Sequence, residues 1–273
     1  MTDFLMHTPY LMLIICGFAV TVTMMFMVWM LSEKINNAGI VDVFWGFGFA
    51  IVTLFYEVIA YLQGWGWLPR KTLVLVMVSL WSLRLGTFLL YRFKRHYPKE
   101  DGRYAAYREA WGDKASMGML GAFEMQAILL ASLTLPFALT ITSDINYFTG
   151  LEWLGVAIWL IAFCGESLAD HQLESFKKDL ANQGKVCQVG LWAYSRHPNY
   201  FFEWLTWIAF YVFALSTRGG AYTAFCPVIM YYFLTRVTGI KATEEQALRT
   251  RGDAYRQYQQ STSPFFLWFK KKQ

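Results

Sequence analysis

The sequence predicts an all-α polytopic membrane protein with about seven transmembrane helices. Of its 273 residues, 56% are hydrophobic and 16% are charged, whereas about a quarter of the residues of a soluble domain are charged. Apolar runs of about 20 residues, the length that crosses a bilayer as a helix, recur along the whole chain. These runs cover residues 10–31, 40–62, 71–91, 119–141, 151–169, 198–216 and 222–238.

Local signals support several of these elements. The first run is too long for the core of a signal peptide and no basic residue precedes it, so we expect a retained helix. Pro198 suits the first turn of the sixth helix. After residue 238 the chain turns polar and predicts an amphipathic helix. The final stretch, S-P-F-F-L-W-F-K-K-K, predicts an interfacial anchor over residues 263–273.

The distribution of Lys and Arg predicts the orientation, because cytoplasmic loops hold the excess of these residues. Nineteen Lys and Arg residues fall in the loops and tail of one side, and three, Arg70, Lys71 and Arg218, fall on the other. We therefore expect the amino terminus outside and the carboxyl terminus in the cytosol. In a bacterium this would be the inner, cytoplasmic membrane.

Composition also limits the domain organisation and the partners. Repeats and low-complexity segments are absent from the sequence, so one membrane domain, residues 1–273, accounts for the chain. The four cysteines have no metal-ligand spacing, and we expect no metal site. The net charge of +5 lies in the cytosolic loops, where it fits the topology signal and contact with membrane lipid. We expect no nucleic-acid partner.

Polar residues within the apolar runs gather near the predicted cytosolic ends. An unpaired charge in hydrocarbon costs several kcal/mol, so such residues usually mark a ligand site. Their agreement across separate helices predicts one shared cavity that opens to the cytosol. The residues concerned are Asp42, Arg84, Glu124, Glu166, Asp170, Asn199, Glu203 and Arg236.

The segment 190–204, G-L-W-A-Y-S-R-H-P-N-Y-F-F-E-W, is the most informative part of this set. Asn199 and Glu203 are four residues apart and share one helix face. Pro198 places the start of the helix, with its free N–H groups, beside Arg196, which predicts an anion site. His197 fits either a structural or a phosphate-facing role.

Five motifs together resemble the steroid 5α-reductase superfamily, in particular its bacterial branch related to the carboxyl-terminal reductase domain. The resemblance covers about residues 40–262. The motifs are V-D-V-F-W-G at 41–46, W-S-L-R-L at 81–85, E-S-L-A-D-H-Q at 166–172, G-L-W-A-Y-S-R-H-P-N-Y-F-F-E at 190–203 and T-G-I-K-A-T-E-E at 238–245.

The resemblance implies a reductase that uses NADPH and adds hydride to an activated C=C bond of a lipophilic, steroid- or isoprenoid-like substrate. By motif, Asn199 and Glu203 are expected to hold the nicotinamide carboxamide and the neighbouring sugar. The expected phosphate, ribose and adenosine contacts are Glu166, Asp170, Lys177, Arg84, Arg95 and Arg236. Arg196, His197 and Tyr200 complete the expected cofactor-binding set.

The proton donor departs from the family pattern. Steroid-reducing members carry a Tyr three residues before the Arg of the third helix, and this chain has Trp81 there. Their Gln-Glu pair on the second helix is also missing. We expect Asp42 to be the catalytic acid in their place.

Two other function classes stay open. The R-H-P-x-Y element at 196–200 is shared with isoprenylcysteine and phospholipid methyltransferases, which use S-adenosylmethionine. A lipid-binding or transport protein without enzymatic activity would also suit a basic cleft and aromatic belts. The E-x-x-x-D spacing at 166–170 favours the reductase.

Overall fold

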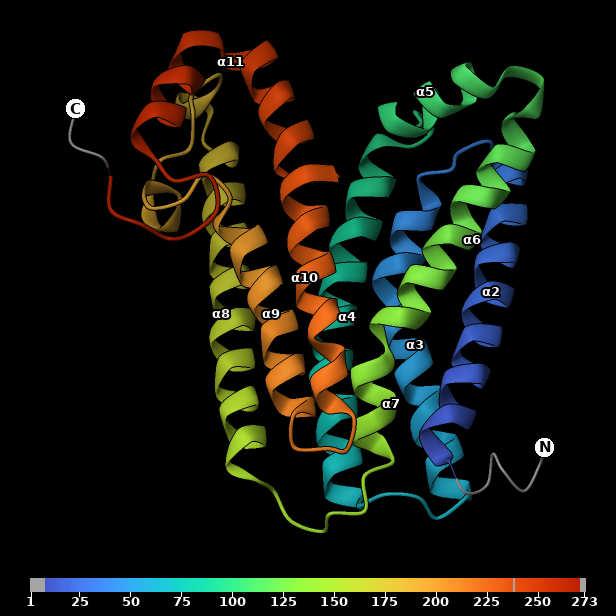
Figure 1. Ribbon diagram of the computed structural model, residues 1–273. Coiled ribbons are helices and arrows are strands. Elements are labelled where there is room, and N and C mark those ends of the chain that lie inside the picture. The colour runs from blue at the N-terminus through green and yellow to red at the C-terminus, as the bar shows by residue number, and fades with distance from the viewer. Residues whose placement is uncertain (1–7, 238, 271–273) are drawn as a thin grey trace. The chain divides into compact units, whose positions relative to one another are not determined.

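A computed structural model describes residues 8–237 and 239–270 (Figure 1). This part of the chain is helical and contains no β-strand. It forms two compact units, which we describe separately. Unit 1 comprises Met1–Phe148 with Thr217–Gly220, and unit 2 comprises Thr149–Ser216 with Ala221–Gln273. The single membrane domain expected from the sequence stays a prediction.

Unit 1 is built around three long apolar helices and a fourth that is broken. Ser82 Oγ donates a 2.6 Å hydrogen bond to Gly46 O, which ties α4 to α3. A side chain at Gly46 would meet Gly86 Cα at 2.7 Å, so only glycine permits this approach. The helices are α2 (Pro9–Ile35), α3 (Ile40–Leu62), α4 (Leu68–His96), α5 (Gly102–Trp111), η1 (Gly112–Lys114), α6 (Ala115–Leu133) and α7 (Leu135–Ile141).

Unit 2 is built on two long helices, α8 and α9, which lie side by side. Thr149 and Glu152 form a capping box that starts α8. At Gly155, α8 approaches the α9 backbone so closely that an added side chain would lie 2.9 Å from Phe213 N. The helices are α8 (Gly150–Lys178), η2 (Leu180–Asn182), η3 (Gly190–Ala193), α9 (Pro198–Ala214), η4 (Gly220–Ala224), α10 (Phe225–Tyr232), η5 (Phe233–Val237) and α11 (Ile240–Ser261).

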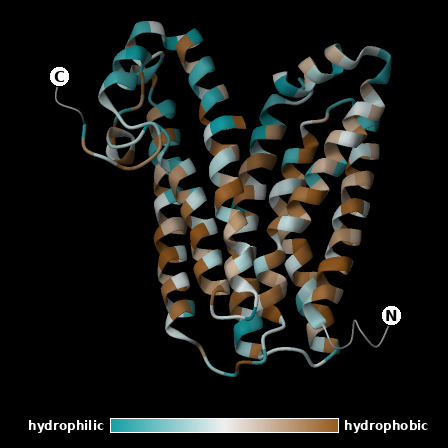
Figure 2. Ribbon diagram, viewed as in Figure 1, coloured by the Kyte–Doolittle hydropathy of each residue, from teal (hydrophilic) through white to brown (hydrophobic). Residues whose placement is uncertain are grey.

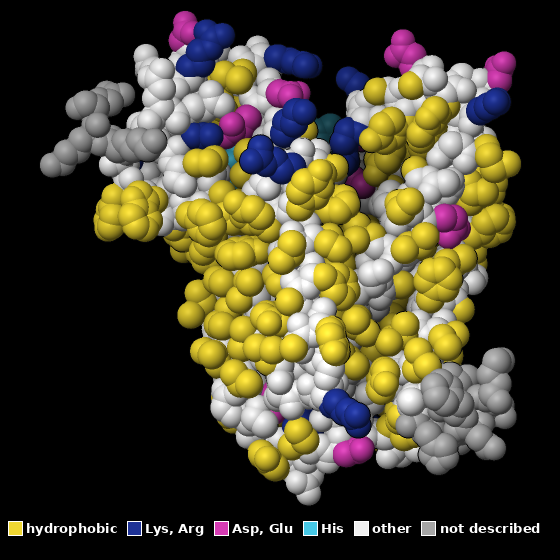
Figure 3. Space-filling view, in the orientation of Figure 1, with side chains coloured by type: hydrophobic (Ala, Val, Ile, Leu, Met, Phe, Trp, Pro, Cys, Tyr) yellow, Lys and Arg dark blue, Asp and Glu magenta, His cyan; other side chains and the backbone are white. Residues whose placement is uncertain are grey.

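The predicted class, an all-α protein with membrane-spanning helices, is confirmed. Within the described residues, six helices are long and apolar enough to cross a bilayer. The predicted span that is not among these six is the sixth, residues 198–216, which forms α9 and has 17 residues. Hydrophobic residues predominate in the middle of the long helices, and hydrophilic residues lie mainly at their ends (Figure 2). Figure 3 shows hydrophobic side chains over the same middle portions. The orientation of the termini stays a prediction.

Two elements differ in detail from the sequence prediction. The fourth span breaks at Thr134, one residue before α7 begins, because Pro136 cannot continue the helix of α6. The polar helix after residue 238 exists as α11 but turns at Gly252, where the backbone angles are φ 50° and ψ −123°. The last three residues of the predicted anchor, 271–273, lie outside the described residues.

Candidate functional site

The start of α9 in unit 2 positions the segment that the sequence singled out. His197 is non-helical, with φ −140°, and Pro198 is the first residue of the helix, as predicted. Asn199 and Tyr200 follow in its first turn. Asn199 donates from Nδ2 to Asp170 Oδ1 of α8 at 3.4 Å, and its own Oδ1 is buried without a hydrogen-bond partner.

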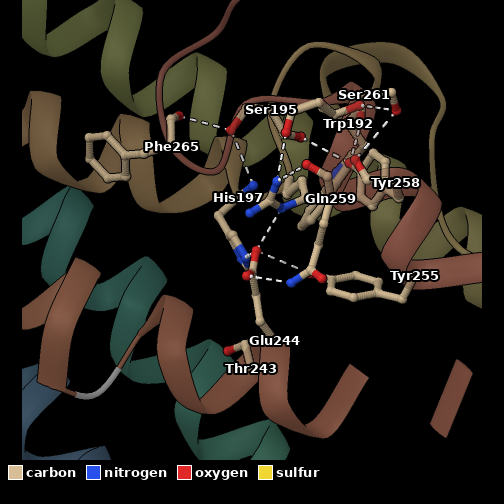
Figure 4. A network of polar contacts seen from close by, with 12 residues as sticks. Trp192, Ser195, His197, Thr243, Glu244, Tyr255, Tyr258, Gln259, Ser261 and Phe265 are labelled. Atoms are coloured by element: carbon tan, nitrogen blue, oxygen red, sulfur yellow. Dashed lines mark hydrogen bonds and ion pairs between the residues drawn. The ribbon is translucent and has the colours of Figure 1, made fainter. Parts of the chain in front are cut away.

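Arg196 and His197 are buried, and both contact the carboxylate of Glu244 in α11. Figure 4 shows His197 pointing toward Glu244. Arg196 Nε lies 2.6 Å from Glu244 Oε1, and its Nη1 donates to Gln259 O and Thr262 O at 2.9 and 2.7 Å. His197 Nε2 lies 3.2 Å from Glu244 Oε1. Burial lowers the pKa of His197 below its ordinary value, although the hydrogen bond to Glu244 opposes this. A neutral imidazole donating to Glu244 fits both observations.

The same network continues through the second half of α11. Gln259 Nε2 donates to Glu244 Oε2 at 2.9 Å, and the Tyr258 hydroxyl donates to Trp192 O and Ser195 O. These contacts tie residues 192–197 to α11 (Figure 4). Arg196 is therefore held largely by protein groups, because one carboxylate and two carbonyls already accept from it.

A cavity of about 550 Å³ lies beside this network, within unit 2. Its walls come from the end of α8, the loop after η2, the start of α9 and α11. Four lining residues are basic, namely Lys177, Lys185, Arg196 and Arg251, and none of the described residues that line it is acidic. The volume falls within the range of about 300–1,000 Å³ typical of small-molecule sites.

Aromatic and polar groups complete the lining. Tyr200 stacks on His197 with ring centroids 5.4 Å apart, and its hydroxyl lies 3.2 Å from Thr243 Oγ1. Trp192 and Phe176 also line the cavity. The cavity therefore offers flat apolar faces, an amide and an excess of positive charge. Such a lining suits a planar, anionic molecule.

Of the twelve residues predicted to form the site, nine belong to unit 2. Five of these line the cavity: Lys177, Arg196, His197, Asn199 and Tyr200. Asp170 is the hydrogen-bond partner of Asn199. Glu203 is buried one turn after Asn199 and accepts from Trp207 Nε1 at 3.2 Å. Glu166 is buried on α8, and Arg236 is exposed on η5.

The remaining three predicted residues, Asp42, Arg84 and Arg95, belong to unit 1. Asp42 Oδ2 lies 3.2 Å from Arg92 Nη2 and 2.7 Å from Arg103 Nη2, and its Oδ1 accepts from the Tyr104 hydroxyl at 2.7 Å. These contacts tie Asp42 of α3 to the start of α5. That all the predicted residues share one cavity stays a prediction.

Several cavity residues were missed by the sequence reasoning. Lys185 and Arg251 lie in polar segments that read as ordinary solvent-exposed regions, and only the contact between Arg251 Nε and Lys185 O, 3.0 Å, shows that they meet. Glu244 did stand in a quoted motif, T-G-I-K-A-T-E-E. The motif indicated that Glu244 is important, but it did not indicate that Arg196 and His197 are its partners. No three His, Cys, Asp or Glu residues of the described chain form a metal-binding group.

Comparison with known proteins identifies a family. Residues 28–262 match the model of a family described as "Protein of unknown function (DUF1295)". The chain belongs to this family. It is also similar to an uncharacterized protein of Schizosaccharomyces pombe, with 27% identity over 87% of this chain and 75% of the yeast protein. No solved structure matches the chain.

Proposed function

We propose that the protein is a membrane-embedded, NADPH-dependent reductase that transfers hydride to an activated C=C bond of a lipophilic substrate. The observation that carries this proposal is the cavity of unit 2, which four basic residues line and no described acidic residue enters. NADPH carries a pyrophosphate and a further phosphate. Arg and Lys are the side chains that bind such groups most strongly.

Three of the four cations in the cavity lining are available to a ligand. Arg196 is already paired with Glu244, so the ligand would meet mainly Lys177, Lys185 and Arg251. Lys177 contacts Glu174 at 3.2 Å, but this pair is half-exposed and holds the lysine weakly. Arg251 and Lys185 are exposed at the rim. Together they would attract an anion before it enters.

Asn199 supplies the group that a nicotinamide ring needs. A carboxamide has both a donor and an acceptor, and so does the side chain of Asn199. Its Oδ1 is buried and has no partner in the described chain, while Nδ2 reaches Asp170 only at 3.4 Å. A buried acceptor left without a partner costs about 1–3 kcal/mol, which a ligand N–H would recover.

The methyltransferase alternative fits the cavity less well. S-adenosylmethionine bears a sulfonium cation and a net positive charge, and a lining of basic residues would repel it. The R-H-P-x-Y element, which suggested this alternative, is explained in this chain by structure, since Arg196 and His197 both bind Glu244. The motifs outside this element that resemble the steroid 5α-reductase superfamily, such as E-S-L-A-D-H-Q at 166–172, support the reductase.

The reaction requires a hydride and a proton. When bound, NADPH would supply a hydride to one carbon of the double bond, and an acid of the protein would protonate the neighbouring carbon, so that the bond would be reduced by two electrons. Trp81 is fully buried against Phe49 with ring centroids 5.0 Å apart and has no phenolic proton to give. Asp42 stays the proposed proton donor. As the donor, Asp42 would act in its protonated form, with the Tyr104 hydroxyl 2.7 Å from its Oδ1.

Ligand titration of the purified protein in detergent tests the proposal. We expect NADPH to bind more tightly than NADH, and S-adenosylmethionine to bind most weakly. Asn199→Ala should weaken NADPH binding about tenfold, which corresponds to one lost hydrogen bond to a buried group. Lys177→Gln should also weaken NADPH binding, and this loss should be larger at low salt, where the charge of the lysine is screened less. Lys178→Gln is the matched control, since this neighbouring lysine does not line the cavity. Preference for the methyl donor would overturn the proposal.

A further inference from the structure

The C-terminal segment of unit 2, residues 262–270, carries large apolar side chains that the protein leaves uncovered. Phe266, Trp268 and Phe269 are 48%, 68% and 79% exposed, and the neighbouring Tyr194 is 46% exposed. Tyr194 and Phe269 contact each other edge to face with ring centroids 6.3 Å apart. We call these four residues the aromatic platform.

The segment that carries the platform is firmly attached to unit 2. Arg196 N donates to Ser263 O at 2.9 Å, Ser195 Oγ donates to Phe265 O at 2.8 Å, and Trp268 N donates to Tyr194 O at 3.0 Å. Ser195 and Ser263 also form a β-bridge. The aromatic side chains are therefore exposed from a fixed backbone and not from a loose tail.

Phe265 fixes the level of the platform relative to the helices of unit 2. It is only 3% exposed and inserts between α9 and α10. Its ring lies 5.9 Å from Phe201, 5.8 Å from Trp204 and 5.2 Å from Tyr231. Phe201 and Trp204 belong to the first two turns of α9. The platform thus lies where apolar α9 begins and the polar loops end.

The chemistry of this surface matches the boundary between lipid and water. Aromatic side chains concentrate at that boundary, and lysines beside them reach the anionic headgroups. Lys270 lies next to Phe269 and holds Gln188 at 3.2 Å. On α10, Tyr231 stacks against Phe266 with ring centroids 6.5 Å apart, and Val228 and Tyr232 of the same helix are 67% and 58% exposed.

We propose that the aromatic platform is a lipid-docking surface that inserts into the headgroup region of an anionic leaflet. The platform shares its attachment with the cavity, because Arg196 both lines the cavity and holds Ser263 and Thr262. Insertion would therefore also set the depth of the cavity wall at the membrane surface. The inference does not depend on which ligand the cavity binds.

Nitroxide labels at two exposed positions test the proposal in the full chain. Phe269→Cys places one label on the platform, and Asp253→Cys places the control on α11, where the Asp253 side chain is 85% exposed. The background is Cys16→Ala with Cys164→Ala, because Cys187 and Cys226 are buried. The vesicles contain phosphatidylcholine with a minority of phosphatidylglycerol.

We expect the label at 269 to collide several-fold more often with oxygen than with an aqueous nickel complex, and the label at 253 to show the reverse. Equal aqueous exposure of the two labels would overturn the proposal. A second measurement keeps the native cysteines: brominated lipids should quench wild type more than Trp268→Phe. If an aqueous quencher alone distinguishes these two proteins, the platform faces water and the proposal fails.

Discussion

At the residue scale, the R-H-P element serves two purposes in this chain. The sequence indicated an anion site because Arg196 precedes the start of a helix. The structure places Arg196 at the cavity but also pairs it with Glu244 and with two carbonyl groups of residues 259 and 262. Those partners lie 48 or more positions along the chain. Sequence spacing could not have indicated them, because no local pattern connects residues so far apart.

Arg196→Gln should therefore destabilise the protein and not only weaken ligand binding. Removing one partner leaves Glu244 partly buried with an uncompensated charge, and breaking a buried pair costs about 3–5 kcal/mol. Thermal unfolding in detergent measures the effect. Arg256→Gln is the control, because its pair with Asp253 is exposed and should contribute less than about 1 kcal/mol. Unchanged stability of Arg196→Gln would contradict the role we assign to this residue.

Asp42 gives a second prediction at this scale. Its carboxylate binds Arg92, Arg103 and the Tyr104 hydroxyl. Asp42→Asn should lower the free energy of unfolding by about 1.5–3 kcal/mol, the range for a hydrogen bond to a charged group. Tyr104→Phe, which removes one contact and no charge, should lower the free energy of unfolding by less than Asp42→Asn does. A variant Asp42→Asn that unfolds normally but turns over slowly would instead support the role of Asp42 as the proton donor.

At the element scale, the polar helix α11 has a larger role than its composition indicated. The sequence predicted an amphipathic helix after residue 238, and α11 exists there. In the structure it forms one wall of the cavity through Thr243, Ala247 and Tyr255. It does so on both sides of the turn at Gly252, because both halves meet the segment that precedes α9.

Gly252→Ala tests this turn. At φ 50° and ψ −123° a residue with a side chain is strained, and we expect a loss of about 1–3 kcal/mol in the free energy of unfolding. The space around Gly252 is open, so the cost would come from the backbone alone. Gly121→Ala is the control: it lies within α6, also in open space, and should stabilise by about 0.5–1 kcal/mol. Equal effects of the two variants would refute the argument.

At the scale of the whole molecule, the sequence predicts the orientation in the membrane. This prediction uses the loops of both units together. Nineteen Lys and Arg residues on one predicted side against three on the other should retain that side in the cytosol. Green fluorescent protein fused after residue 273 should therefore fluoresce, and alkaline phosphatase fused at the same position should stay inactive. An active phosphatase fusion would show that the orientation is reversed.

The sequence alone determined the helical membrane class. Backbone polar groups in hydrocarbon must hydrogen-bond within their own segment, which a helix achieves, and each helix that crosses the bilayer needs an apolar run of sequence. It also picked out segment 190–204 and five residues that line the cavity. Only the tertiary structure decided that Lys185 and Arg251 join them in the cavity lining and that Glu244 pairs with Arg196. Apolar periodicity is a local property of the chain, whereas the meeting of charged side chains depends on how distant helices and loops pack.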